Sequence, residues 1–76
     1  MSSNKEAKYI LSCVFNVSVN DIKLDVRLDN YVHWDSLGHM RLVLYLENFL
    51  GRSIEIEEVL SITDLDSIQK LIDSKL

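Results

Sequence analysis

The sequence has no proline and only two glycines among its 76 residues. Both residue types interrupt helices and shape the tight turns of sheet proteins, so their scarcity favours a helical fold. The longest apolar run extends only from Leu42 to Leu46, far short of the ~20 residues that span a bilayer. No apolar region of the signal-peptide kind follows Met1–Lys5. We therefore expect a cytoplasmic protein that does not insert into membranes.

Cysteine and basic residues are also scarce. The lone Cys13 excludes an intramolecular disulfide and suits a reducing compartment, and we expect it to pack as a small apolar side chain. Lys and Arg number 8 against 12 Asp and Glu, and the net charge of −4 disfavours binding to nucleic-acid phosphates. The acidic residues between Arg52 and Lys70 predict a solvated face, with a docking surface for basic partners as the alternative.

A chain of this length is expected to form a single domain, residues 1–76, which buries about 60–65% of its unfolded surface. Apolar residues make up 47% of the chain, enough for one helical core but with little room for an enclosed catalytic pocket. No metal site is expected, because the two histidines and Cys13 lack zinc-ligand spacing. Asp21, Asp25 and Asp29 recur at every fourth position, yet no glycine hinge of a calcium loop accompanies them.

The most informative stretch begins at Asp35, a suitable N-cap, and ends at Gly51, a residue that readily adopts the left-handed conformation after a helix. Residues 36–50 between them have helical periodicity, with two apolar faces instead of one. The broader face, expected to be buried, consists of His39, Leu42, Val43, Leu46, Phe49 and Leu50. The second face consists of Leu37, Met40 and Leu44, accompanied by Ser36, Arg41, Glu47 and Asn48. Either this helix is sandwiched within the core, or its second face is kept for partners.

The chain before this stretch predicts a helix over residues 4–17, with Ser3 and Glu6 forming a capping box at its start. Residues 18–34 predict a long loop with a short helical turn near Ile22. Such a long connection is unusual in a compact domain and is often functional. The apolar anchors expected to hold the loop against the core are Val26, Leu28, Tyr31 and Val32.

The chain after Gly51 predicts two further helices. Residues 57–61 predict a short helix with Val59 and Leu60 facing inward. Thr63 is expected to cap the last helix, whose apolar stripe consists of Leu65, Ile68, Leu71, Ile72 and Leu76. The predicted fold is therefore all-α, a small bundle of three to four helices with a long first loop.

Ser36 occupies the first helical position, where unpaired N–H groups and the helix dipole favour an anion such as a phosphate ester. The triplet Asp35-Ser36-Leu37 resembles the attachment motif of acyl carrier proteins. The resemblance extends over nearly the whole chain, through Ile54 and Ile62-Thr63 to the last helix. It implies that Ser36 carries a 4'-phosphopantetheine arm donated by coenzyme A, whose thiol holds an acyl or aminoacyl group as a thioester.

The resemblance also implies partners. A phosphopantetheinyl transferase, which supplies the magnesium, would read Asp35 and Leu37 beside the attachment serine. A ligase would load the acyl or aminoacyl group, and a downstream transferase or synthase would use it. The residues expected to bind partners are Leu37, Met40, Arg41, Leu44 and Glu47. A monomer suits such a mobile carrier, and Trp34 is expected either to anchor the preceding loop or to touch the arm.

Fatty-acid carriers usually have acidic residues along this helix, where the present chain has Gly38, Arg41 and Asn48. An arginine in the middle of the face repels partners built around Lys and Arg. We therefore expect a dedicated carrier in a specialised biosynthetic pathway.

Two other functions are weighed against the carrier. The chain is not expected to be an enzyme, because Ser36 lacks a Gly-x-Ser-x-Gly elbow and a domain this small offers no evident oxyanion hole. As possible bases for the serine, His39 is expected to pack, and His33 either to pack or to shield the base of the arm. The main alternative is a helical adaptor whose second apolar face binds a partner without modification of Ser36.

Overall fold

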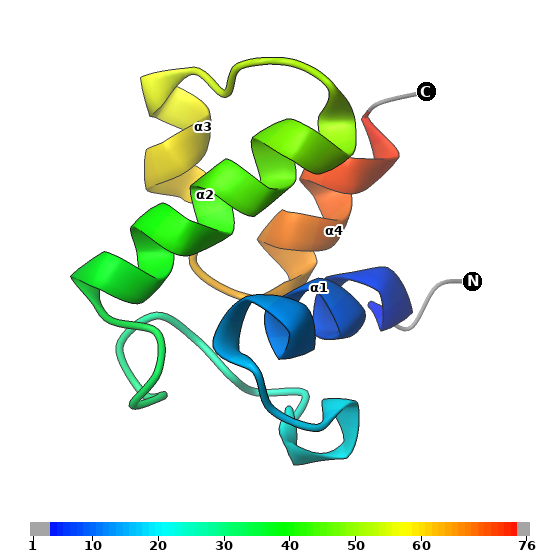
Figure 1. Cartoon of the computed structure of the whole chain (residues 1–76), viewed down its shortest axis with the longest axis vertical. Helices are drawn as coiled ribbons and strands as arrows, with labels where there is room; N and C mark the ends of the chain where they lie inside the picture. Colours follow the sequence, from blue (N-terminus) through cyan, green and yellow to red (C-terminus); the bar gives the residue numbers. More distant parts are fainter. Residues whose placement is uncertain (1–3, 75–76) are drawn as a thin grey trace.

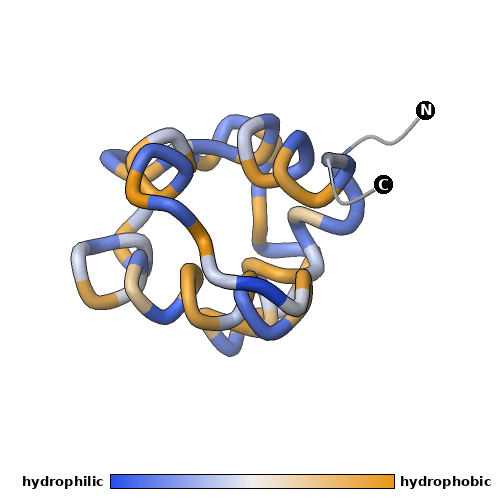
Figure 2. The backbone as a smooth tube through the Cα atoms, turned by 90° about the horizontal axis from the view of Figure 1, so that it is seen from above, coloured by the Kyte–Doolittle hydropathy of each residue, from blue (hydrophilic) through white to orange (hydrophobic). Residues whose placement is uncertain are grey.

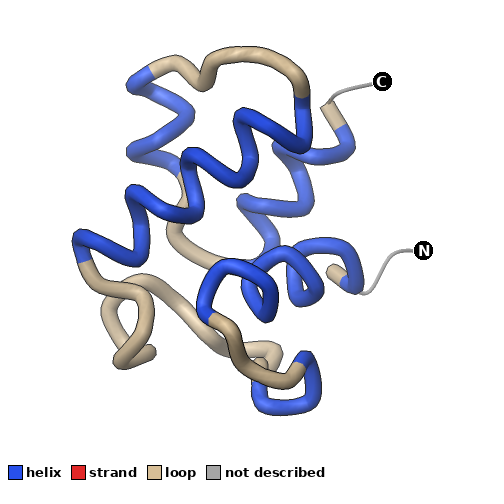
Figure 3. Tube along the Cα trace, viewed as in Figure 1, coloured by secondary structure: helices blue, strands red, loops and turns tan. Residues whose placement is uncertain are grey.

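A computed structural model describes residues 4–74, in which α-helices are joined by loops (Figure 1). In chain order the elements are α1 (Lys5–Phe15), the 3-10 turn η1 (Val19–Asp21), α2 (Ser36–Leu50), α3 (Ile56–Ser61) and α4 (Leu65–Asp73). Figure 3 shows the same arrangement, with no strand within the described range. The predicted small all-α bundle with a long first loop is confirmed.

The helices and the first loop share one hydrophobic core. Figure 2 shows apolar and polar residues alternating along the helices, as expected of amphipathic elements that each bury one face. The fully buried large side chains are Trp34, Ile10, Leu11, Ile22, Leu42, Leu46, Ile62, Leu65 and Ile68. None of the helices between residues 4 and 74 is long and apolar enough to cross a membrane.

α1 is shorter than predicted, and its first turn is capped by a side chain of α4. Asn4 precedes it in the left-handed conformation and makes no side-chain cap bond, and the predicted cap Ser3 lies outside the described residues. The amide of Ala7 instead donates to Oε1 of Gln69 on α4, at 3.2 Å. Gln69 is buried, and its amide nitrogen donates to Glu6 at 2.9 Å. The start of α1 is therefore completed by α4, which the local sequence does not predict.

α2 buries most of the face expected to be buried, including Leu42, Val43, Leu46 and Leu50. Phe49 was predicted to be part of that face, but 40% of it is exposed, so the prediction is wrong for this residue. Phe49 lies at the edge of the apolar stripe, where its ring lines a shallow hollow with Tyr9 and other α1 residues. The second face is exposed to solvent, so the sandwiched alternative is excluded.

The first loop lies against the core, into which it inserts the buried side chains of Ile22, Val26 and Trp34. Its middle is fixed to the connection between α3 and α4 by a hydrogen bond from the amide of Leu28 to the carbonyl of Thr63, at 2.9 Å. Trp34 is fully buried and therefore anchors the loop, the first of its two predicted roles. Leu28 and Tyr31 pack partly buried against the core, as predicted.

Three further predictions of burial are wrong. Val32 is 83% exposed at a turn before α2, Leu60 is 72% exposed on α3, and Cys13 is exposed on α1. Cys13 falls beside Tyr9, outside the apolar stripe of its helix, and α3 turns only Val59 partly inward. Apolar character alone does not decide which face of a short element is buried, because much of a folded surface is apolar.

α4 begins one residue later than predicted. Its N-cap is Asp64, whose carboxylate accepts from the amide of Ser67 at 2.9 Å, so Thr63 is not the cap. Asp64 has the extended backbone that an N-cap needs, and its carboxylate is the stronger acceptor at the positive end of the helix dipole. The predicted stripe is buried at Leu65, Ile68, Leu71 and Ile72, and Leu76 lies outside the described residues.

Candidate functional site

The candidate attachment serine is the first residue of α2, as predicted, and it is exposed. Asp35 precedes it with an extended backbone, and its carboxylate accepts from the amide of Gly38 at 2.8 Å. The carbonyl of Asp35 accepts from the amide of His39 at 2.7 Å, which closes the first helical turn. The backbone around Ser36 is therefore held by Asp35, while its hydroxyl is open to solvent at the positive end of a 15-residue helix.

His39 joins the loop, α2 and α3. The indole N–H of Trp34 donates to Nδ1 of His39 at 3.0 Å, and Nε2 of His39 lies 3.0 Å from the carbonyl oxygen of Val59. An indole nitrogen is only a donor, so Nδ1 must accept, and the neutral ring carries its proton on Nε2 and donates it to Val59. Both ring nitrogens are therefore occupied within the fold. His39 packs, as the sequence predicts, and neither nitrogen is left to take a proton from Ser36.

An aromatic cluster fixes the end of the loop that leads to the serine. The ring of His33 stacks on Phe15 with centroids 6.2 Å apart, and it meets Tyr31 edge-on at 5.3 Å. Phe15 also lies 6.3 Å from Trp34, measured between ring centroids. Such pairs prefer offset or edge-on contacts of this kind. The C-terminal end of α1 thus supports the chain just before the start of α2.

Gly38 has a packing role that the sequence pattern did not indicate. It is buried, and a Cβ at this position would collide with the carbonyl oxygen of His33 and lie 3.0 Å from the ring of Phe15. Gly38 therefore faces the loop, and its interpretation as a missing surface acid is wrong. The available signal was a glycine in the first turn of a helix, where it costs about 1 kcal/mol relative to alanine and so suggests close packing.

The exposed side of α2 carries most of the predicted partner-binding residues. Leu37, Met40 and Leu44 are each more than half exposed, and Arg41 is exposed among them. We call Leu37, Met40, Arg41 and Leu44 the exposed α2 face.

Glu47, the other charged residue predicted to bind partners, is partly buried. One of its carboxylate oxygens accepts from the amide of Ile54 at 2.9 Å, which fixes the loop after α2. This hydrogen bond gives Glu47 a structural task that the sequence pattern did not indicate.

α3 is held by polar contacts at its start. Arg52 donates to both carboxylate oxygens of Glu58, at 3.0 and 2.8 Å, and Glu58 also accepts from the amide of Glu55 in a capping box. The hydrogen bonds from Arg52 and from the Glu55 backbone lower the pKa of Glu58 to about 2. α3 has no fully buried residue, so these contacts and the bond to His39 define its position.

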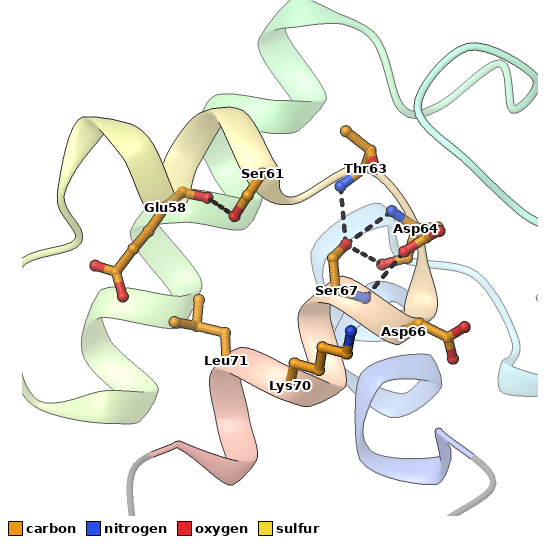
Figure 4. Close-up of a pocket in the computed structure, with 8 residues that line it drawn as sticks. All are labelled: Glu58, Ser61, Thr63, Asp64, Asp66, Ser67, Lys70 and Leu71. Atoms are coloured by element: carbon orange, nitrogen blue, oxygen red, sulfur yellow. Dashed lines mark hydrogen bonds between the residues drawn. The ribbon is translucent and has the colours of Figure 1, made fainter.

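A hollow between α3 and α4 is lined mainly by polar side chains (Figure 4). Ser67 lies in it, and its hydroxyl oxygen accepts from the amides of Thr63 and Asp64 and donates to the carbonyl of Asp64. These groups are used to cap α4, and Glu58 at the other side is paired with Arg52. Most of the polar groups that line the hollow are therefore accounted for by hydrogen bonds that stabilise the ends of α3 and α4. Within residues 4–74, no group of three or more His, Cys, Asp or Glu side chains is placed to hold a metal ion.

The comparisons with known proteins found no match: neither a protein-family model nor a curated protein is similar to this chain. The sequence motif and the geometry around Ser36 are therefore the basis for assigning a function.

Proposed function

We propose that this protein is an acyl or aminoacyl carrier whose Ser36 hydroxyl takes a 4'-phosphopantetheine arm from coenzyme A. The observation that carries the proposal is the motif Asp35-Ser36-Leu37 at the start of α2, with the serine exposed and the surrounding backbone fixed. The resemblance of the sequence to acyl carrier proteins supplies the identity of the modification.

The attachment reaction uses the serine as a nucleophile within a transferase active site. The Ser36 oxygen attacks the phosphorus that bears the pantetheine arm, and a new O–P bond forms as the pyrophosphate bond of coenzyme A breaks. The 3',5'-adenosine diphosphate leaves, and the hydroxyl proton passes to a base of the transferase. The positive end of the α2 dipole favours the phosphodiester that results.

Once attached, the arm tethers its cargo to the carrier. Tethering turns encounters between a free substrate and an enzyme into local ones at a high effective concentration. In this proposal the exposed α2 face is the recognition surface for the transferase, for a loading ligase and for a downstream transferase or synthase. In the same proposal the protein works as a monomer in the cytoplasm, and Arg41 is an argument for a specialised biosynthetic pathway.

The test is intact mass after incubation with coenzyme A and a broad-specificity phosphopantetheinyl transferase. We expect the wild type to gain the mass of one arm and Ser36→Ala to gain none while keeping its helical circular dichroism. Ser53→Ala, at an exposed loop serine, is the matched control and should load like the wild type. A Ser36→Ala variant that still loads, or a folded wild type that several transferases fail to load, would contradict the carrier function.

The second candidate is a helical adaptor that binds its partner without modification. The exposure of Leu37, Met40 and Leu44 favours it, because contiguous exposed apolar side chains mark interaction sites. In that case Ser36→Ala leaves partner binding intact, and the mass assay shows no gain. The mass assay and the partner-binding assay on the wild type and Ser36→Ala therefore distinguish the two functions.

A further inference from the structure

We infer that the exposed α2 face docks a protein partner that places a carboxylate against Arg41, an inference that rests on the proposed carrier function and identifies the chemistry of its partner. The face combines three features of a docking surface: apolar side chains that are more than half exposed, a single cation among them, and a rigid helix beneath.

The apolar part of the face consists of three exposed side chains in succession along the helix. Leu37, Met40 and Leu44 follow one another at spacings of three and four residues, and each is between 55% and 63% exposed. Side chains at this spacing lie on one side of a helix. Covering them with an apolar surface removes them from water, which favours association. Methionine at the centre adapts its shape to more than one partner surface.

Arg41 is the one charge that α2 offers to a partner. Its spacing from Leu37 and Leu44, four and three residues, places it on the same side of the helix. No carboxylate within residues 4–74 forms an ion pair with it, whereas Arg52 and Arg27 each have one. Glu47, the other charged residue of the helix apart from histidine, uses its carboxylate to hold the amide of Ile54. The guanidinium is thus available, with none of its own helix's acids to neutralise it.

A partner that docks on this face must place a suitable chemical group opposite the guanidinium of Arg41. A partner that covers the apolar neighbours of Arg41 also removes water from the charge, which is costly unless a hydrogen-bonding anion replaces that water. A carboxylate matches the fork of the guanidinium with two parallel hydrogen bonds. A lysine or arginine opposite it would be repelled.

The partner is a protein and not a membrane or a nucleic acid. The net charge of −4 repels anionic lipid surfaces and phosphate backbones as a whole, and one arginine does not overcome it. A folded protein can instead present one acid within an apolar contact.

The experiment uses a displayed library of amphipathic helical peptides with random residues on one face, selected on the full-length protein. We expect the enriched peptides to carry Asp or Glu among apolar residues and to bind Arg41→Glu at least about fivefold more weakly. Leu44→Asp should abolish the binding. Lys23→Glu, a charge reversal of an exposed residue in the first loop, is the matched control and should bind within about twofold of the wild type.

Three results of the peptide selection would overturn the inference: enriched peptides that are rich in Lys or Arg, peptides that bind Arg41→Glu as well as the wild type, or peptides that tolerate Leu44→Asp. Binding of the wild type, but not of Arg41→Glu, to phosphatidylglycerol vesicles would also overturn it in favour of a membrane. The readout is independent of the arm, because Ser36→Ala should bind the same peptides. A failure to load coenzyme A with acid-selective peptides intact would therefore reject only the carrier function.

Discussion

Gly38 shows at the scale of one residue how the site is assembled. Glycine is a poor helix former, yet here it lies in the first turn of the helix that carries the candidate serine. The carbonyl of His33 and the ring of Phe15 occupy the space that a Cβ would need. The missing side chain lets the loop approach the helix closely, and that approach places Ser36 at the surface.

We expect Gly38→Ala to lower the free energy of unfolding by about 1–3 kcal/mol, because the new methyl group forces the loop away from α2. Helix propensity alone predicts the opposite, a gain of about 1 kcal/mol. Urea unfolding of the two proteins decides between these signs. Asn48→Ala, on the exposed side of the same helix, is the control and should stay within about 0.5 kcal/mol of the wild type. A more stable Gly38→Ala protein would contradict the packing argument.

Glu58 supplies a second test at this scale. Its pKa is lowered to about 2 chiefly by hydrogen bonds from Arg52. Because the folded pKa lies below the ordinary value of 4.5, the pair favours the folded state above that pH. This contribution is lost as the pH falls from 4.5 to about 2.

We expect Arg52→Ala to raise the pKa of Glu58 towards its ordinary value, measured by NMR titration of the side-chain carboxyl carbon. Arg27→Ala, which removes the partner of Asp29, serves as the control and should leave Glu58 unchanged. An unchanged pKa in Arg52→Ala would show that the backbone amide of Glu55 alone stabilises the carboxylate.

At the scale of elements, the helices differ in how they are held. α1, α2 and α4 each bury an apolar stripe, whereas α3 has no fully buried residue and depends on hydrogen bonds at its two ends. One of these bonds comes from His39, which also accepts from the indole of Trp34. The same imidazole thus fixes the position of α3 and the end of the long loop.

His39→Leu removes both hydrogen bonds and leaves the buried indole N–H of Trp34 without a partner. We expect a loss of about 1–3 kcal/mol in the free energy of unfolding and faster amide hydrogen exchange in α3. His33→Leu is the matched control, since that exposed ring stacks on Phe15 without a hydrogen bond to α3. Equal exchange of α3 in wild type and His39→Leu would show that the capping box at Glu55 and Glu58 holds the helix alone.

At the scale of the whole molecule, local patterns predicted the elements better than they predicted how the elements meet. The helix limits at Asp35 and Gly51 were correct, because capping depends on nearby residues. The roles of Gly38, His39 and Gln69 depend on contacts with other elements, which no local periodicity encodes.

Burial was predicted correctly for most of the stripes of α2 and α4, with Phe49 as the exception on α2. It was also wrong for Cys13 at the edge of α1, and for Val32 and Leu60, which lie in short segments where one turn decides the direction of a side chain. The candidate site itself was predicted as far as its serine, its capping aspartate and its exposed apolar neighbours. The contacts of Gly38, His39 and the aromatic cluster, which hold the backbone next to the serine, were not predicted.

The hydrogen bond from Ala7 to Gln69 joins positions 62 residues apart and has a consequence for synthesis on the ribosome. While the chain is being made, the first helix lacks the acceptor that completes its start until the residues of α4 have been added. A short isolated helix is marginal in water. The first helix therefore gains its full stability only after α4 has emerged from the ribosome and can reach it.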